Sequence, residues 1–187
     1  MIESKKLVLA TGNEGKIREL KVLLADKGIS TIPQGDLNIP DIEETGLTFI
    51  ENAILKARNA SRLSNLPALA DDSGLEVDFL NGAPGIYSAR FSGAQANDKS
   101  NRDKLLEDLA SVSAEKRSAR YQAVLVYLRH ADDPTPIICQ GTWNGSIALE
   151  EKGDQGFGYD SIFYVPEKNC HAAELDAQTK KELSHRG

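Results

Sequence analysis

The sequence predicts an α/β fold built on a mixed β-sheet with flanking helices. Two observations support this fold class. Short apolar runs alternate with helical patterns near the start of the chain, and two longer strand-like runs follow later with only a turn between them. The first pattern predicts parallel strands and the second a hairpin, so one sheet should contain both. The 187 residues, 40% hydrophobic and 27% charged, suit a single domain over 1–187 or two lobes that share one sheet.

The start of the chain predicts a strand, a loop and a helix. Residues 7–10 form a short apolar run, and the turn-rich loop 11–15 follows it. Helical spacing then predicts a helix that Gly28 ends; its apolar positions are Ile17, Leu20, Leu23 and Leu24. A second strand is expected near residues 29–33, and a long loop follows it.

The clearest predicted element is a helix over residues 48–64. Thr48 and Glu51 have the spacing of a capping box, in which each side chain satisfies a free backbone N–H of the other residue. The apolar face of this helix comprises Phe49, Ile50, Ala53, Ile54, Ala57 and Ala60. Three basic residues lie away from the centre of that face: Lys56, Arg58 and Arg62.

The remaining elements continue the mixed pattern. An apolar strand over residues 66–70 is expected to end at the turn Asp71-Asp72-Ser73-Gly74, and a short strand over 75–79 should follow. The later elements are, in order, an ordered loop over 82–93, a helix over 98–109, a hairpin of strands 120–128 and 137–143, a strand over 161–165 and a short helix over 177–184.

The loop Thr11-Gly12-Asn13-Glu14-Gly15-Lys16 has the features of a phosphate site. Glycines let backbone N–H groups approach a ligand, and the helix start that follows favours anions. Lys16 in the first helical turn opposes the helix dipole at a cost of about 0.3–1 kcal/mol, an effect that a bound anion would reverse. The alternative is an ordinary turn with a solvated lysine. The GxxxxGK[ST] spacing is absent, so this is not a Walker-type ATP site.

Paired carboxylates indicate a candidate metal site. Asp71 and Asp72 follow an apolar run, where ligands collect in open α/β sheets, and two adjacent like charges repel unless a cation screens them. Glu43 or Glu44 could supply a further oxygen, and oxygen ligands suit Mg²⁺. One of these carboxylates could also accept a proton from an attacking water. The alternative is a plain turn, because Asp-Asp-Ser-Gly is good turn chemistry.

Two later segments are candidates for contacts to a base. Phe157-Gly158-Tyr159-Asp160 places aromatic rings beside a glycine and a carboxylate, and stacking of a base on such a ring contributes about 1–3 kcal/mol. The alternative is that the rings fill the core. Near the end of the chain, Lys180, His185 and Arg186 could bind a phosphate or a purine carbonyl, or could form a polar, frayed terminus. The same two interpretations, a ligand contact or a solvated charge, apply to Lys56 and to the segment Ser88-Ala89-Arg90.

Composition excludes several other classes. The net charge of −6 argues against a protein that coats nucleic acid, because phosphate neutralisation supplies most of the affinity of such proteins. Neither the two cysteines nor the three histidines have zinc-type spacing. The segment 1–10 has too short an apolar run for a signal peptide, and no stretch approaches the roughly 18 apolar residues of a membrane span. A cytoplasmic location is the expectation.

Six segments in order resemble the inosine/xanthosine triphosphate pyrophosphatase family. They are TGNEGK at 11–16, EETGLTFIENAILKA at 43–57, ALADDSGLEVD at 68–78, GAPGIYSARFSG at 82–93, FGYDSIF at 157–163 and SHRG at 184–187. The resemblance implies an elongated α/β fold with two lobes around a central nucleotide cleft, and a homodimer. It also implies that ITP, dITP and XTP are hydrolysed to the monophosphate and pyrophosphate with Mg²⁺, which removes damaged nucleotides from the precursor pool.

The resemblance also assigns roles to residues. Asp72 corresponds to the proton acceptor and a metal ligand, Glu44 or Glu43 to the other metal carboxylate, and Asp71 to nearby support. The triphosphate would contact Thr11, Gly12, Asn13, Glu14, Gly15 and Lys16, with Lys16 also stabilising charge in the transition state and Lys56 assisting. Ser73 corresponds to a further substrate contact. The base would contact Phe157, Gly158, Tyr159, Asp160, Lys180, His185 and Arg186.

Two alternatives and one departure accompany this prediction. A Maf-like pyrophosphatase for modified pyrimidine nucleotides would prefer UTP or methylated pyrimidines over ITP. A non-catalytic nucleotide sensor or RNA-binding module would bind without hydrolysis. Members of the family continue past the SHRG segment into a further helix, whereas this sequence stops at Gly187. We therefore expect a less well closed base pocket.

Overall fold

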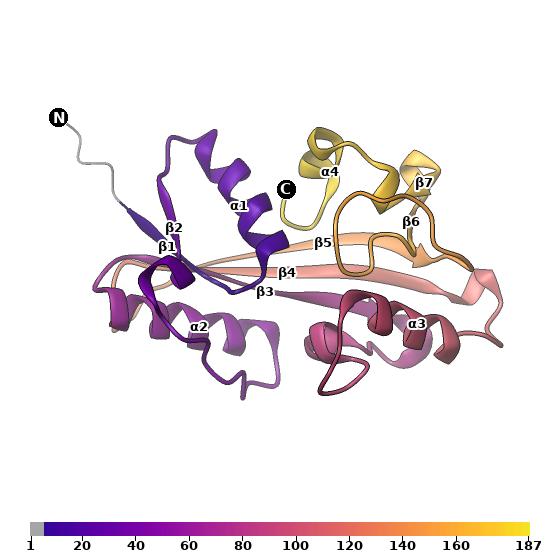
Figure 1. Ribbon diagram of the computed structural model, residues 1–187, viewed down its shortest axis with the longest axis horizontal. Helices are drawn as coiled ribbons and strands as arrows, with labels where there is room; N and C mark the ends of the chain where they lie inside the picture. Colours follow the sequence, from indigo (N-terminus) through magenta and orange to yellow (C-terminus); the bar gives the residue numbers. More distant parts are fainter. Residues whose placement is uncertain (1–5) are drawn as a thin grey trace. The chain divides into compact units, whose positions relative to one another are not determined.

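A computed structural model describes residues 6–187 and has a seven-stranded mixed sheet with flanking helices (Figure 1), which confirms the predicted fold class. The strand order is β2-β1-β3-β4-β5-β6-β7. The strands are β1 (Leu7–Ala10), β2 (Thr31–Pro33), β3 (Ala68–Val77), β4 (Ser118–Leu128), β5 (Ile137–Ile147), β6 (Phe163–Val165) and β7 (Cys170–His171). Strand β1 pairs in parallel with β2 and β3, whereas β6 is antiparallel to both β5 and β7.

Within residues 6–187, four α-helices accompany the sheet: α1 (Glu14–Ala25), α2 (Phe49–Ser64), α3 (Asp98–Asp108) and α4 (Ala177–Leu183). The chain divides into two compact units. Unit 1 takes its described residues from 6–72, 123–140 and 186, and unit 2 consists of 73–122, 141–185 and 187. The divisions fall inside β3, β4 and β5, so these three strands contribute to both units.

Unit 1 has a core on each face of its strands, and Figure 1 shows α1 on one side of β1 and α2 on the other. Successive side chains of a strand point to opposite faces. Accordingly, Val8 and Ala10 pack with Ala53 and other small residues of α2, whereas Leu7 and Leu9 pack with Ile17 and Leu20 of α1. The alternation along β1 therefore explains how one short strand fixes two helices.

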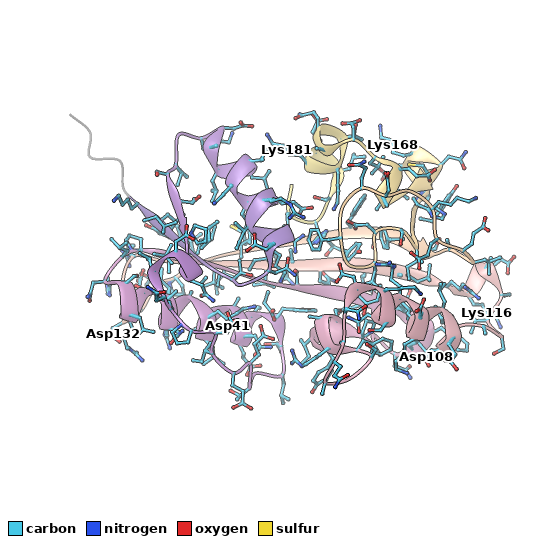
Figure 2. The ribbon with its side chains drawn as sticks, in the orientation of Figure 1. Asp41, Asp108, Lys116, Asp132, Lys168 and Lys181 are labelled. Atoms are coloured by element: carbon cyan, nitrogen blue, oxygen red, sulfur yellow. The ribbon has the colours of Figure 1, made fainter. Side chains whose placement is uncertain are left out.

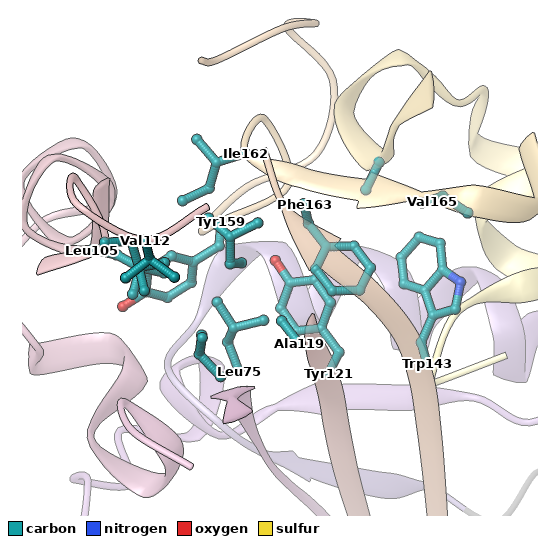
Figure 3. Close-up of a cluster of buried hydrophobic side chains, with 14 of the residues drawn as sticks. Leu75, Leu105, Val112, Ala119, Tyr121, Trp143, Tyr159, Ile162, Phe163 and Val165 are labelled. Carbon is teal, nitrogen blue, oxygen red and sulfur yellow. The ribbon is translucent and has the colours of Figure 1, made fainter. Parts of the chain in front are cut away.

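Unit 2 has a core rich in aromatic side chains. Tyr121, Trp143 and Phe163 contact one another there, with the Tyr121 and Phe163 ring centroids 4.7 Å apart and those of Trp143 and Phe163 5.3 Å apart (Figure 3). From α3, Leu105 packs into the same cluster, and Leu109 joins it just beyond the helix end. This core supports the loop between β5 and β6, which contains the predicted base-contacting segment.

The predicted turn at Asp71-Asp72-Ser73-Gly74 is wrong, because β3 runs unbroken through these residues. Short polar residues and glycine are typical of turns, but here the two carboxylates are paired with basic side chains. Gly74 also allows a close approach, since a Cβ atom there would lie only 2.3 Å from the Gly85 carbonyl oxygen. Asp71 and Asp72 consequently lie in the middle of a strand and not at its end.

Most of the other predicted elements are confirmed with shifted ends. The hairpin strands are longer than predicted, the loop over 82–93 contains a 3₁₀ helix at Gly85–Arg90, and a short strand, β7, was not predicted. Thr48 caps α2 by accepting the Glu51 N–H at 3.2 Å, while the Glu51 carboxylate accepts the Leu47 N–H and the Thr48 hydroxyl, each at 2.9 Å. Ile50, predicted on the apolar face, is 37% exposed.

No helix among residues 6–187 is long and apolar enough to cross a membrane. The segment 1–10, which we assessed for a signal peptide, begins in residues 1–5, and these lie outside the described residues.

Candidate active site

Unit 1 contains a cluster of buried and mostly buried charged side chains, whereas Lys116, Asp132 and Lys168 are examples of charged side chains that are exposed (Figure 2). The cluster comprises the buried Asp71, Asp72 and Arg186 and the partly buried Lys16 and Lys56, and its neighbours Glu19 and Glu44 are also partly buried. A buried charge is costly unless it is paired, and buried ion pairs are weak devices for stability alone. Their concentration in one place therefore marks a candidate functional site.

Asp71 is the fully buried centre of this cluster. Its carboxylate contacts Lys16 Nζ at 2.9 Å and Arg186 Nε at 2.7 Å, and Arg186 Nη1 also contacts Glu19 Oε2 at 2.9 Å. Burial alone would raise the pKa of Asp71, but the charges of Arg186 and Lys16 hold it well below its usual range. Asp71 thus stays ionised and links β3 to α1 and to Arg186.

Asp72, the next residue of β3, has a different environment. Lys56 Nζ bridges two carboxylates, at 2.7 Å from Asp72 Oδ1 and 2.8 Å from Glu44 Oε1. The second oxygen, Asp72 Oδ2, is buried and forms no hydrogen bond with the described part of the chain. Burial raises the pKa of Asp72 even though Lys56 opposes the shift. A carboxylate with a raised pKa and an uncommitted oxygen is suited to accept a proton.

The two lysines of the cluster share one backbone acceptor. Lys56 Nζ donates to the Asp71 carbonyl at 2.9 Å and Lys16 Nζ at 3.5 Å. Burial lowers the pKa of Lys16, against the raising effect of Asp71. Burial would also lower the pKa of Lys56, but the charges of Asp72 and Glu44 outweigh it and raise that pKa. Two ammonium groups are therefore concentrated beside the carboxylates, as an incoming polyanion would require.

The predicted phosphate loop does connect β1 to α1. Thr11 Oγ1 accepts the Asn13 N–H at 3.2 Å, and Asn13 caps the helix by accepting the Lys16 N–H at 3.0 Å. The N–H groups of the first helical turn have no partner within their own helix, so those of Glu14 and Gly15 can bind an anion. Lys16 and Asp72 both belong to this unit, and the charge of Lys16 acts on Asp72.

The four carboxylates predicted to bind a metal do not form one metal-binding group. Among the described residues, no group of three or more His, Cys, Asp or Glu side chains could hold a metal ion. Asp71 is committed to its two cations, and Glu43 is exposed. Glu44 and Asp72 nevertheless converge on one ammonium group, and Asp72 Oδ2 is left over. Since Mg²⁺ is often bound by one or two carboxylates together with waters and substrate phosphates, this pair fits the ion.

The predicted base-contacting residues of unit 2 differ in their burial and in their contacts. Tyr159 is buried in the core and donates to the Ser88 carbonyl at 2.8 Å, so its ring fills space. Phe157 is partly exposed, and Lys180 Nζ lies 5.1 Å from the centroid of its ring. Asp160 Oδ2 accepts from Lys180 Nζ at 2.7 Å and from the Phe157 N–H at 2.9 Å. Asp160 therefore links the Phe157 backbone of this loop to the Lys180 side chain.

The end of the chain is ordered and not a frayed terminus. The His185 ring stacks on Tyr121, with centroids 4.8 Å apart and planes 9° apart. Arg186 belongs to unit 1, where its side chain is held by Asp71 and Glu19. Ser88 has a structural role, because its hydroxyl donates to the Gly85 carbonyl and accepts the Leu75 N–H. Ser73 is partly buried in β3.

Sequence reasoning missed several partners of these residues. Glu19 holds Arg186, and Tyr121 both stacks on His185 and donates to Asp160 at 3.2 Å. The only local indication of a role for Glu19 was its position three residues after Lys16 on the same predicted helix, where the two side chains are neighbours. No signal in the sequence pointed to Tyr121.

A mixed α/β sheet, a helix start with N–H groups that can bind an anion, and a buried carboxylate beside two lysines indicate an α/β protein that can process phosphates. The chain belongs to the Ham1 family, whose pattern matches residues 7–187. This confirms the predicted family.

Two comparisons illustrate the similarity. A dITP/XTP pyrophosphatase of Photobacterium profundum is 59% identical over 182 residues, which are 97% of this chain and 92% of the relative. Among solved structures, a HAM1 protein from Coxiella burnetii has a TM-score of 0.88 at 50% identity, covering 97% of this chain and 92% of that one. The similarity thus extends over nearly the full length in both sequence and structure.

Proposed function

We propose that this protein hydrolyses damaged purine nucleoside triphosphates (ITP, dITP and XTP) to the nucleoside monophosphate and pyrophosphate. The observation that carries the proposal is the Asp72 carboxylate, buried, held at one oxygen by Lys56 and uncommitted at the other. The names of the relatives, dITP/XTP pyrophosphatase, agree with this activity.

In the proposed reaction, Asp72 Oδ2 accepts a proton from water as the water oxygen attacks the α-phosphorus. A bond forms between that oxygen and the α-phosphorus, and the bond from the α-phosphorus to the bridging oxygen breaks, so pyrophosphate leaves with the electron pair. Its buried oxygen Oδ2, which forms no hydrogen bond with the described part of the chain, is available to take that proton. Lys56 holds the reacting side chain in place through Oδ1.

The triphosphate would be bound by cationic groups of unit 1. Lys16 and Lys56 supply ammonium groups, and the first turn of α1 supplies backbone N–H groups. These donors would stabilise charge on the phosphate oxygens as the bond breaks. Glu44 and Asp72 would hold Mg²⁺, which supplies Lewis-acid polarisation of the phosphate when bound.

Base recognition is assigned to unit 2. Phe157 would stack on the purine, and Lys180 and His185 would favour a carbonyl oxygen at the 6-position over the amino group of adenine. Arg186 is held by two carboxylates, so we assign it to the charge network of Asp71 in place of the predicted base contact.

The test is a turnover panel of ITP, XTP, GTP, ATP and UTP with Mg²⁺, in which pyrophosphate and orthophosphate are measured separately. We expect pyrophosphate from ITP and XTP and little product from ATP. Asp72→Asn should lower kcat by about 10²–10⁴-fold, while the exposed control Asp132→Asn should leave it unchanged. Orthophosphate as the first product would contradict the reaction, and normal turnover of Asp72→Asn would remove Asp72 from it.

The same panel tests the other functions. A preference for UTP would favour the Maf-like alternative, and nucleotide binding without hydrolysis would favour a sensor. The homodimer and the cytoplasmic location also stay predictions. Sedimentation of the purified protein tests the first, and imaging of a tagged chain tests the second.

A further inference from the structure

The backbone of Gly158 is held at both of its hydrogen-bonding groups by one helix. Asp98 Oδ2 accepts the Gly158 N–H at 2.7 Å, and Arg102 Nη1 donates to the Gly158 carbonyl at 2.9 Å. Asp98 and Arg102 are four residues apart on α3, so their side chains project from the same face. We call these two residues the α3 clamp.

The arginine of the clamp is itself oriented. Its Nε contacts Glu151 Oε2 at 2.9 Å, and Ser161 Oγ donates to the same carboxylate oxygen at 2.8 Å. The Arg102 side chain is only 18% exposed, unlike a solvated surface arginine. Because the guanidinium is planar, these contacts fix the direction in which Nη1 points at Gly158.

The clamped glycine adopts a backbone conformation that an alanine would resist. Gly158 has φ of +63°, and nothing lies within 4 Å of the position that a Cβ atom would take. A glycine in this left-handed region has many other conformations available to it, so it needs external contacts to hold one. The clamp supplies contacts on the N–H and the carbonyl side.

A second hydrogen bond holds the backbone of the same loop, one residue before Gly158. Asp160 Oδ2 accepts the Phe157 N–H, so the backbone is held on both sides of the Phe157 side chain, by Asp160 at 2.9 Å and by Asp98 at 2.7 Å. These two hydrogen bonds hold the backbone from which the Phe157 ring extends, and Lys180 Nζ lies 5.1 Å from the centroid of that ring.

We propose that Asp98 and Arg102 are positioning residues for base recognition. They fix the Gly158 peptide, which holds the Phe157 ring in the orientation that stacks on a purine. The inference rests on the proposed function, because that function assigns Phe157 to the base. The clamp therefore affects substrate binding and base preference more than the bond-breaking step.

The experiment compares Asp98→Ala and Arg102→Ala with the wild-type protein in steady-state kinetics on ITP and ATP. Loss of one charge-assisted hydrogen bond should raise KM for ITP about tenfold and reduce the preference for ITP over ATP. The expected change in kcat is less than about threefold, because the bond-breaking groups are untouched. Asp98→Asn keeps an oxygen acceptor for the Gly158 N–H and should restore most of the wild-type KM.

The matched controls are Lys99→Ala and Asp103→Ala. These residues form an exposed i,i+4 pair on the same helix, with Nζ to Oδ2 at 2.7 Å, and neither contacts Gly158. Both controls should keep the wild-type KM and base preference. A rise in KM equal to that of the clamp variants would assign the effect to α3 as a whole and overturn the proposal.

A second readout does not depend on turnover. Hydrogen exchange of the segment 155–161 should be faster in Asp98→Ala and Arg102→Ala than in the two controls. No turnover by the wild-type protein would refute the proposed function, while faster exchange confined to the clamp variants would still support the clamp. Unchanged KM and unchanged exchange in an active protein would overturn the clamp alone. If Asp98→Ala does not fold, Arg102→Lys, which lacks the planar fork, should show the same effects.

Discussion

The two units hold their candidate site residues in different ways. In unit 1, Lys16, Lys56, Asp71 and Asp72 project from a strand and two helices, and their positions are fixed by ion pairs among themselves. In unit 2, Phe157 lies on a loop whose shape depends on contacts to its backbone. Charges on regular elements can be fixed with high precision, as proton transfer requires, whereas a loop can adapt to the outline of a base. Substitutions in unit 1 should therefore affect chemistry and stability, and those in unit 2 substrate choice.

The largest effect should follow the loss of the bridging lysine. Lys56→Met leaves Glu44 and Asp72 without their shared cation and removes one donor to the phosphates. We expect kcat on ITP to fall about 10²–10³-fold. Lys152→Met, which removes an exposed lysine paired with Glu150, is the control and should be as active as the wild-type protein. If Lys56→Met keeps full kcat, the claim that the residues of unit 1 carry the chemical step is contradicted.

Removal of the buried guanidinium should have the next largest effect. Arg186→Ala takes a cation from Asp71 and Glu19, and the breaking of a buried pair costs about 3–5 kcal/mol. Urea unfolding of the nucleotide-free protein measures the loss. Arg120→Ala is matched to it, because Arg120 also contacts two carboxylates, Glu76 and Asp78, but is 36% exposed. Its loss should be below about 1 kcal/mol; equal losses would show that burial is not what matters.

A smaller effect is expected in unit 2. Lys180→Met removes the cation from Asp160, which keeps hydrogen bonds from Tyr121 and the Phe157 N–H. The free energy of unfolding should fall by about 1–2 kcal/mol, and KM for ITP should rise more than kcat falls. A dominant loss of kcat would contradict the division of roles between the units.

The smallest effect concerns pH. Because the pKa of Asp71 is lower in the folded than in the unfolded protein, its contribution to stability is present above about pH 4 and is lost as the pH falls through the folded value. Arg186→Ala should raise the pKa of Asp71 in the folded protein toward its value in the unfolded protein. The variant should therefore lose less stability than the wild-type protein between pH 5 and pH 3. Urea midpoints at both pH values measure this, and identical pH slopes would contradict it.

Much of the fold was predictable, since periodicity and capping depend on neighbouring residues. The helices α2 and α3 and the β4–β5 hairpin follow from such patterns. The course of β3 was not predictable, because Asp-Asp-Ser-Gly has the same composition in a turn as in a strand whose charges are paired by distant residues. Arg186 and Asp71 are 115 positions apart, and no local pattern links them.

Some members of the candidate site were predicted, but the contacts among them were not. Asp72, Lys16 and Lys56 were identified, and unit 1 does gather them. The clamp residues Asp98 and Arg102 were not identified, because they act on a backbone group of a glycine, which leaves no complementary side chain to recognise in the sequence.

The carbonyl oxygen of Asp71, which accepts from both Lys16 and Lys56, has a consequence for protein engineering. This acceptor belongs to the main chain, so it persists whichever amino acid occupies position 71, and a library of coded substitutions leaves it in place. An amide-to-ester replacement of the bond after residue 71, made by semisynthesis, would weaken it. That single-atom exchange would reveal how far two lysines depend on one peptide group.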